Sequence, residues 1–88
     1  MAFKVLIHPK ALNDIPSSRR DQIKAALKEL NDPFPGGNKS KIEGYKEEIY
    51  RLRIGSFRAM YRINSEKKEV YVYEFLTQEQ AHKKYGRL

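Results

Sequence analysis

Four arginines lie within twelve residues near the middle of the chain, and their spacing suggests binding of phosphate groups. They are Arg51, Arg53, Arg58 and Arg62. Residues 48–54 and 57–63 each alternate apolar and polar side chains, as strands with one buried face do. Gly55-Ser56 separates the two segments. Glycine at the first central position is typical of a two-residue type II′ turn, so the sequence predicts a β-hairpin.

A two-residue turn determines which residues of the hairpin face each other. Six apolar or aromatic side chains then share one face, in the pairs Ile54 with Phe57, Leu52 with Ala59, and Tyr50 with Tyr61. The opposite face pairs Arg53 with Arg58 and Arg51 with Met60, and we expect Arg58 to be exposed there. Like charges directly opposite each other destabilise a sheet. A phosphodiester backbone would turn this repulsion into attraction, because each guanidinium can bind two phosphate oxygens. The alternative is that the arginines are solvated and pair with Glu47, Glu48 or Glu74.

Length and charge limit the class of protein. The 88 residues are enough for one domain, residues 1–88, with a formal net charge of +7. This excess of Lys and Arg favours a polyanionic partner, with nucleic acid first, an acidic protein second and an anionic membrane third. Solubility alone is the alternative explanation of the charge.

The residues that are rare or absent exclude several kinds of site. The chain has no cysteine, which excludes disulfides and thiolate sites and suits a reducing cytosol. Its two histidines, His8 and His82, are too few for a histidine-rich metal centre, so we expect no metal and no cofactor. No apolar run approaches the roughly 20 residues that span a bilayer. We therefore expect a cytoplasmic protein without a membrane partner.

The first half of the chain predicts one strand and two helices. Residues 3–7 are typical of a short strand, and Pro9 favours a short helix through Ile15. Ser18 and Asp21 resemble a capping box, which predicts the start of a second helix. Its apolar face is formed by Ile23, Ala26, Leu27 and Leu30. His8 precedes a proline and is expected to be structural. Residues 31–38 contain two prolines and two glycines and predict a loop, followed by a short extended piece and a turn over 39–45.

The last part of the chain predicts a strand and a helix. Residues 70–76 are strongly β-prone, with Tyr71, Tyr73 and Phe75 expected on one face as core or helix contacts. Thr77 is a candidate cap for a helix over residues 78–85. The resulting order is β-α-α-β-β-β-α. This order predicts an α+β fold, an antiparallel meander sheet with two N-terminal helices and a short C-terminal helix.

The segments 42–45 and 49–63 resemble the central hairpin of the RelE/ParE toxin superfamily. Its members show a leucine-x-glycine approach and a Y-R-x-R-x-G-x-[YF]-R-x-x-Y hairpin, and the length and element order also fit. The resemblance implies a toxin of a type II toxin–antitoxin system that forms a hetero-oligomer with a RelB-like antitoxin. It does not separate ribosome-dependent mRNA endoribonucleases of the RelE branch from DNA gyrase inhibitors of the ParE branch. An RNA-binding domain without catalysis is a third possibility.

In the RelE branch the resemblance implies metal-independent cleavage of mRNA on the ribosome, with the 2′-hydroxyl attacking the adjacent phosphate. Arg58 matches the hairpin arginine that stabilises the transition state. Arg51 and Arg53 match positions that are lysines in the best-studied branch, where arginine binds phosphate but is a poor proton acceptor. After the last strand the family usually has glycine, then His or Lys, then arginine. Residues 76–80 of this chain are Leu-Thr-Gln-Glu-Gln, with no basic side chain.

The C-terminal tail is the nearest source of proton transfer. His82 titrates near neutral pH and could act as acid or base, and Tyr85 could stack on a base or donate a proton. The alternative is a loose surface helix. The predicted catalytic residues are Arg51, Arg53, Arg58, His82 and Tyr85. The predicted RNA- or phosphate-binding residues are Lys39, Lys41, Arg62, Lys83, Lys84 and Arg87.

Overall fold

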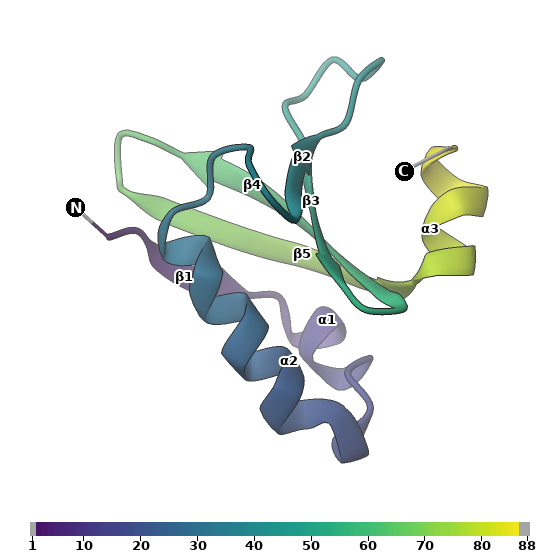
Figure 1. Ribbon diagram of the computed structural model, residues 1–88. Helices are drawn as coiled ribbons and strands as arrows, with labels where there is room; N and C mark the ends of the chain where they lie inside the picture. Colours follow the sequence, from purple (N-terminus) through teal and green to yellow (C-terminus); the bar gives the residue numbers. More distant parts are fainter. Residues whose placement is uncertain (1, 87–88) are drawn as a thin grey trace.

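The computed structural model describes residues 2–86, which form a five-stranded sheet and the helices packed on it (Figure 1). The elements in chain order are β1 (Lys4–Ile7), α1 (Pro9–Asn13), the 3-10 turn η1 (Ser17–Arg19), α2 (Arg20–Leu27), the 3-10 turn η2 (Lys28–Asn31), β2 (Lys39–Lys41), β3 (Tyr50–Ile54), β4 (Phe57–Asn64), β5 (Glu69–Thr77) and α3 (Gln78–Tyr85). The strands lie in the order β1-β5-β4-β3-β2. The predicted α+β fold is confirmed, with β2 as an additional strand.

The two edge strands differ in direction. β1 runs parallel to β5, with Lys4 opposite Glu69 and Ile7 opposite Val72. The predicted antiparallel meander is confirmed for β3, β4 and β5. The direction of β1 was not predicted, because strand direction depends on the path of the chain rather than on residue pattern. β2 runs antiparallel to β3 and coincides with the predicted extended piece.

The β3–β4 hairpin has the predicted register. Ile54 lies opposite Phe57 and Arg53 opposite Arg58. Gly55 has a φ of 56°, and among the described residues Lys68 alone of the non-glycine residues has a positive φ. Ser56 therefore has a negative φ, which identifies the turn as type II′ rather than type I′.

The main core lies between the sheet and the helices α1 and α2. Ile23, Leu27 and Leu30 are buried in it, which confirms the predicted apolar face. The helix itself is shorter than predicted, because α2 ends at Leu27 and the chain continues as η2. Six side chains of the hairpin pack in or against the same core: Tyr50, Leu52, Ile54, Phe57, Ala59 and Tyr61.

The predicted starts and ends of the N-terminal helices need two corrections. Ser18 does not cap a helix, because the 3-10 turn η1 already begins one residue earlier and neither η1 nor α2 has a side-chain cap. α1 ends at Asn13, short of the predicted Ile15. His8 is structural as predicted, because its Nδ1 accepts a hydrogen bond from the Lys10 backbone N–H at 3.0 Å and caps α1.

A second, smaller core lies on the other face of the sheet, under α3. Its buried members are Ile42, Ile49 and Met60, with Tyr73, Leu76 and Tyr85 packed against them. The face that carries the arginines is therefore partly covered, rather than open along its length. None of the helices within residues 2–86 has the length and apolar character needed to cross a membrane.

A β-bulge explains why the aromatic residues of β5 do not share one face. Met60 lies opposite Glu74 but Tyr61 lies opposite Val72, so Tyr73 is an extra residue on β5. An extra residue resets the alternation of side chains. Phe75 therefore joins the main core while Tyr73 packs in the second one, and Tyr71 is exposed. The predicted single face for these three residues is wrong.

The Tyr61 hydroxyl joins β4 to the loop after η2, and its loss should destabilise the protein. This buried group donates to the Pro33 carbonyl at 2.7 Å. Tyr61→Phe leaves that carbonyl without its partner, so we expect the free energy of unfolding to fall by about 1 kcal/mol in urea titrations. Tyr71→Phe, at an exposed position of β5, should change it by less than about 0.5 kcal/mol. Equal effects of the two substitutions would contradict this role of Tyr61.

Candidate nucleic-acid interface

Three arginines of the hairpin meet on the face of the sheet that is turned away from α1 and α2. Arg53 and Arg58 lie directly opposite each other, and Arg51 lies opposite Met60. Arg53 is exposed, Arg51 is half-buried and Arg58 is only 3% exposed. Among the described residues, none of the three forms an ion pair with a carboxylate. We call these residues the arginine cluster.

Arg58 is buried, contrary to the prediction that it is exposed. Its Nη1 donates to the carbonyls of Gly55 at 2.9 Å and Phe57 at 2.8 Å, which turns the guanidinium back toward the hairpin turn. The chain after β5 meets the same turn. The backbone N–H of Gln78 donates to the Ser56 carbonyl at 2.7 Å, so the start of α3 is attached to the turn. The hairpin pattern alone carries no information about this contact.

Arg51 is held in place by β2. Its Nη2 donates to the Ser40 hydroxyl at 2.7 Å. The Nε atoms of Arg51 and Arg58 are buried and have no hydrogen-bond acceptor in the described residues. A buried donor without an acceptor costs free energy, so the packing of these two guanidinium groups lowers the stability of the fold.

The electrostatics of the cluster favour an anionic ligand. Burial lowers the pKa of Arg51, and the charge of Arg53 lowers it further. Burial likewise lowers the pKa of Arg58, followed by the charges of Arg51 and Arg53. Guanidinium groups nevertheless keep their proton at neutral pH. The three charges therefore repel one another at close range, and a bound phosphate would relieve that repulsion.

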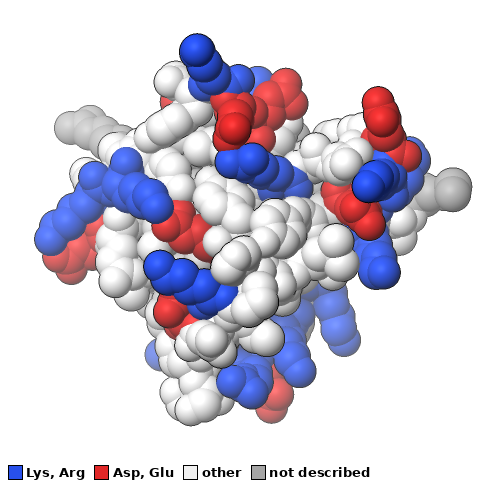
Figure 2. All heavy atoms as spheres, turned by 180° about the vertical axis from the view of Figure 1, so that it is seen from behind, with Lys and Arg blue, Asp and Glu red and all other residues white. Residues whose placement is uncertain are grey.

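Most of the other predicted phosphate-binding residues already have protein partners. Lys41 pairs with Glu48 at 3.9 Å and Lys83 with Glu79 at 3.6 Å, while Arg62 pairs with Glu47 and Lys84 with Glu74. Lys39 donates from Nζ to the Asp32 carbonyl at 2.6 Å and so supports the loop before β2. Arg87 lies outside the described residues. Figure 2 shows the same pattern on one face of the molecule, where many basic side chains lie beside acidic ones.

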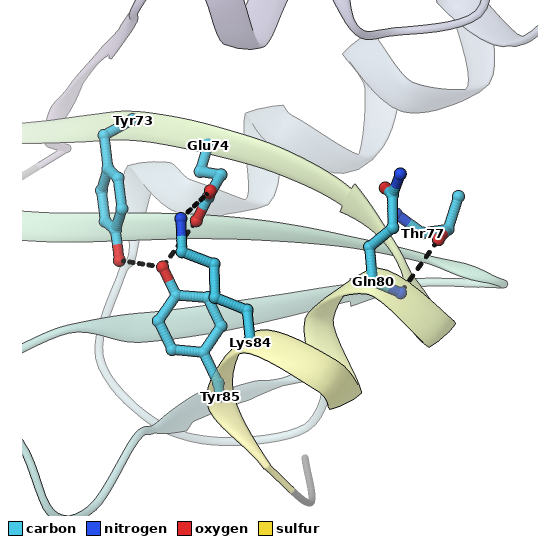
Figure 3. A network of polar contacts seen from close by, with 6 residues as sticks. All are labelled: Tyr73, Glu74, Thr77, Gln80, Lys84 and Tyr85. Carbon is cyan, nitrogen blue, oxygen red and sulfur yellow. Dashed lines mark hydrogen bonds and ion pairs between the residues drawn. The ribbon is translucent and has the colours of Figure 1, made fainter.

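Tyr85 belongs to a network that fastens α3 to β5 (Figure 3). Its hydroxyl donates to Glu74 Oε1 at 2.5 Å and lies 3.1 Å from the Tyr73 hydroxyl, and Lys84 pairs with the same carboxylate. Burial and the bond to Glu74 raise the pKa of Tyr85. α3 begins at the predicted cap, Thr77, in a capping box with Gln80. The alternative of a loose surface helix is therefore wrong for Tyr85.

His82 lies on the exposed side of α3, near the turn that holds Arg58. It lines an open pocket of about 650 Å³ with Ser56 and Phe57 of the hairpin and with Thr77 and Lys83. Both the Arg58 guanidinium and the His82 imidazole therefore lie near the hairpin turn. In the described part of the chain, no group of three acidic or histidine side chains is placed to hold a metal ion.

Two residues that shape this region were missed in the sequence. Ser40 orients Arg51 from β2, and Glu74 holds α3 through Tyr85 and Lys84. The sequence does mark Glu74 as unusual, since it is the one acidic residue within the β-prone run 70–76. Nothing in the sequence indicates the role of Ser40, because only the pairing of β2 with β3 brings it to Arg51.

Comparison with known proteins gives the family. The family model of the ParE toxin of the type II toxin–antitoxin system parDE matches residues 5–82. The chain belongs to this family. No curated protein sequence matches it.

Solved structures of RelE toxins are similar to this ParE-family toxin. An archaeal RelE–RelB complex from Pyrococcus horikoshii OT3 is 26% identical, covers 92% of this chain and 100% of its own, and has a TM-score of 0.71. The free E. coli toxin RelE, in a mutant with two arginines changed to alanine, is 25% identical with a TM-score of 0.67, over 93% and 90% of the two chains. The RelBE2 complex of Mycobacterium tuberculosis is 17% identical with a TM-score of 0.71, over 88% and 99%, and shows the fold alone.

Repulsion in the arginine cluster predicts that removing one charge stabilises the toxin. Arg53 is exposed and lies opposite Arg58, so Arg53→Gln should raise the free energy of unfolding by about 0.2–1 kcal/mol at low salt. The gain should shrink in 1 M salt, because ions screen exposed charges. Lys67→Gln, at an exposed position between β4 and β5, is the matched control for loss of one positive charge. An equal rise in the free energy of unfolding of both variants would show that it depends on net charge and not on repulsion within the arginine cluster.

The buried tyrosines predict that the toxin loses stability in alkali. Burial raises the pKa of both Tyr61 and Tyr85, whereas an unfolded tyrosine titrates near about 10. Above that pH the unfolded chain releases protons that the folded chain keeps, so the free energy of unfolding falls as pH rises. Tyr85→Phe should make this fall shallower in urea titrations between pH 8 and about 11. If Tyr85→Phe and the wild type have the same slope, Tyr85 does not have a raised pKa in the folded toxin.

Proposed function

We propose that this toxin cleaves mRNA on the ribosome through attack of a 2′-hydroxyl on the adjacent phosphate, without a resident metal ion. The observation that carries the proposal is the arginine cluster, in which Arg53 faces Arg58 and no carboxylate neutralises either. An arrangement that costs stability is typical of a functional site. The similarity to RelE toxins over most of both chains supports the same activity.

Each arginine has its own part in the proposed reaction. The 2′-hydroxyl loses its proton to water as its oxygen bonds to phosphorus, so the phosphorane carries one more negative charge than the diester. Its collapse to a cyclic phosphate breaks the bond to the 5′ oxygen, and preorganised donors stabilise the phosphorane most where water is excluded. Arg58 is the buried member, so we assign it to this charge. Arg51, oriented by Ser40, and the exposed Arg53 would bind the flanking phosphates. None of the three serves as the base, since guanidinium keeps its proton.

Proton transfer is assigned to His82. The imidazole is exposed beside the hairpin turn, and imidazole is the side chain most often used as a general acid, so we assign it to protonation of the leaving 5′ oxygen. The Tyr85 hydroxyl already donates to Glu74, and its raised pKa disfavours release of the proton. We therefore treat Tyr85 as a positioning residue that holds α3 in place.

The proposal includes an antitoxin as well as the ribosome and its mRNA. The P. horikoshii neighbour is a RelE–RelB complex. We propose that a RelB-like antitoxin likewise binds this toxin in a cytoplasmic hetero-oligomer. An acidic segment over the arginine cluster would supply the missing counter-ions and block access of mRNA.

Inhibition of DNA gyrase is the second candidate. Residues 78–80, at the start of α3, are Gln-Glu-Gln and place no positive charge where RelE-branch toxins usually have one. The family model that matches the chain is also that of ParE. A toxin of this kind would need no proton transfer, so His82 would be dispensable.

Induction of the toxin in cells distinguishes the two candidates. We expect primer extension to show new 5′ ends within mRNA coding sequences after induction. His82→Ala should slow their appearance by about 100-fold or more, because it removes the general acid. Lys67→Ala is the control, since this exposed residue precedes β5, at the opposite end of that strand from α3. A single substitution is preferable to deleting residues 81–88, which would uncover Met60 in the second core.

Intact mRNA together with loss of DNA supercoiling would contradict the proposed nuclease activity and support inhibition of DNA gyrase. Cleavage by His82→Ala at the wild-type rate would instead keep the nuclease and place proton transfer on another group.

A further inference from the structure

A second pocket opens on the arginine-bearing face, between the loop before β3 and α3. It has a volume of about 430 Å³ and is lined by Tyr45, Lys46, Glu47, Ile49, Arg62, Tyr73 and Tyr85. Arg62 lies four residues beyond Arg58 on β4, on the same face of the strand, which is a distance of about 13 Å. A nucleotide bound in this pocket would therefore lie within a few nucleotides of a phosphate held by Arg58.

The wall of the pocket is aromatic. The Tyr45 ring meets the Tyr85 ring edge to face, with centroids 5.7 Å apart and an interplanar angle of 64°. Tyr45 is 47% exposed, whereas Tyr85 is fixed by its hydrogen bonds to Glu74 and Tyr73. An exposed ring that is braced from behind offers a surface on which an unpaired nucleobase can stack.

The rim of the pocket carries an oriented carboxylate. Arg62 lies over the Tyr73 ring, 5.3 Å from its centroid, and pairs with Glu47. This pair uses Glu47 Oε2, and a carboxylate can accept about four hydrogen bonds. Glu47 can therefore accept further donors while Arg62 holds it in place.

Two parallel acceptors select one nucleobase. The Watson–Crick edge of guanine presents two adjacent donors, N1–H and the N2 amino group. Adenine and cytosine present a donor beside an acceptor, and uracil presents one N–H between two carbonyls. A carboxylate at this edge therefore pairs with guanine and leaves unmatched acceptors against the other bases.

We propose that this pocket binds a guanine base of single-stranded RNA, stacked on Tyr45 with its Watson–Crick edge on Glu47. The pocket then determines a base preference near the cleaved phosphate. The inference rests on the proposed function in taking RNA as the substrate, but base preference in binding can be measured without cleavage.

The test uses the full-length toxin and fluorescently labelled uridine octamers that carry one central guanosine, adenosine or inosine. Inosine keeps N1–H but lacks the N2 amino group. We expect the wild type to bind the guanosine octamer at least about 5-fold more tightly than either of the others, as one bidentate contact allows. Glu47→Gln should reduce that ratio to near one. Glu48→Gln is the matched control, because Glu48 has the same charge, pairs with Lys41 and lies outside the pocket.

Tyr45→Leu tests the stacking contact separately. It should weaken binding of all three octamers by about 5-fold or more and leave their ratio unchanged, because stacking is tolerant of sequence. Equal thermal unfolding midpoints of the Glu47→Gln and Glu48→Gln variants show that the fold is intact in both.

Three results would overturn the inference: no binding of any octamer, no preference for guanosine in the wild type, or the same preference in Glu47→Gln as in Glu48→Gln. A Glu47-dependent preference in a toxin that leaves ribosomal mRNA intact would support the guanine pocket and contradict the nuclease. Cleavage of mRNA by a toxin without that preference would support the nuclease and contradict the guanine pocket.

Discussion

The register of the β3–β4 hairpin is the constraint on which the rest of this structure depends. Gly55 takes the positive φ that a type II′ turn needs, so two residues suffice to connect the strands. Side chains alternate along each strand, and a shift by one residue would exchange the two faces. In the observed register Leu52 and Tyr61 point into the main core, and Arg53 meets Arg58 on the opposite face. Packing energy on one face thus holds together like charges on the other.

The second core keeps that strained face in a defined shape. Met60 lies on the same face as the arginines and is fully buried beneath α3. α3 is fastened at its start, where the Gln78 N–H bonds to Ser56, and near its end, where Tyr85 and Lys84 meet Glu74. The first contact brings the helix against the hairpin turn, beside which Arg58 is buried. The buried Arg58 guanidinium is less screened by water than an exposed one, so its charge acts more strongly.

Neutralisation of charge separates the arginine cluster from most of the other predicted phosphate-binding residues. Arg62, Lys41, Lys83 and Lys84 each have a carboxylate partner, whereas Arg51, Arg53 and Arg58 have none among the described residues. A net charge of +7 is therefore a poor guide to where a polyanion binds. The arginine cluster is a better guide, because its like charges lie close together without a carboxylate partner among the described residues.

The residue pattern was sufficient for several features that depend on neighbours along the chain, although it misplaced the cap at Ser18 and the end of α1. The alternation around Gly55-Ser56 predicted the hairpin pairs, the spacing of Ile23, Leu27 and Leu30 predicted the buried helix face, and Thr77 predicted the start of α3. Contacts between segments that are distant in the sequence could be identified only from the tertiary structure. The bulge at Tyr73, the parallel pairing of β1, the burial of Arg58 and the bond from Ser40 to Arg51 all join residues that no local periodicity relates. Turn geometry and side-chain alternation act over a few residues, whereas burial and charge pairing depend on which elements the folded chain brings together.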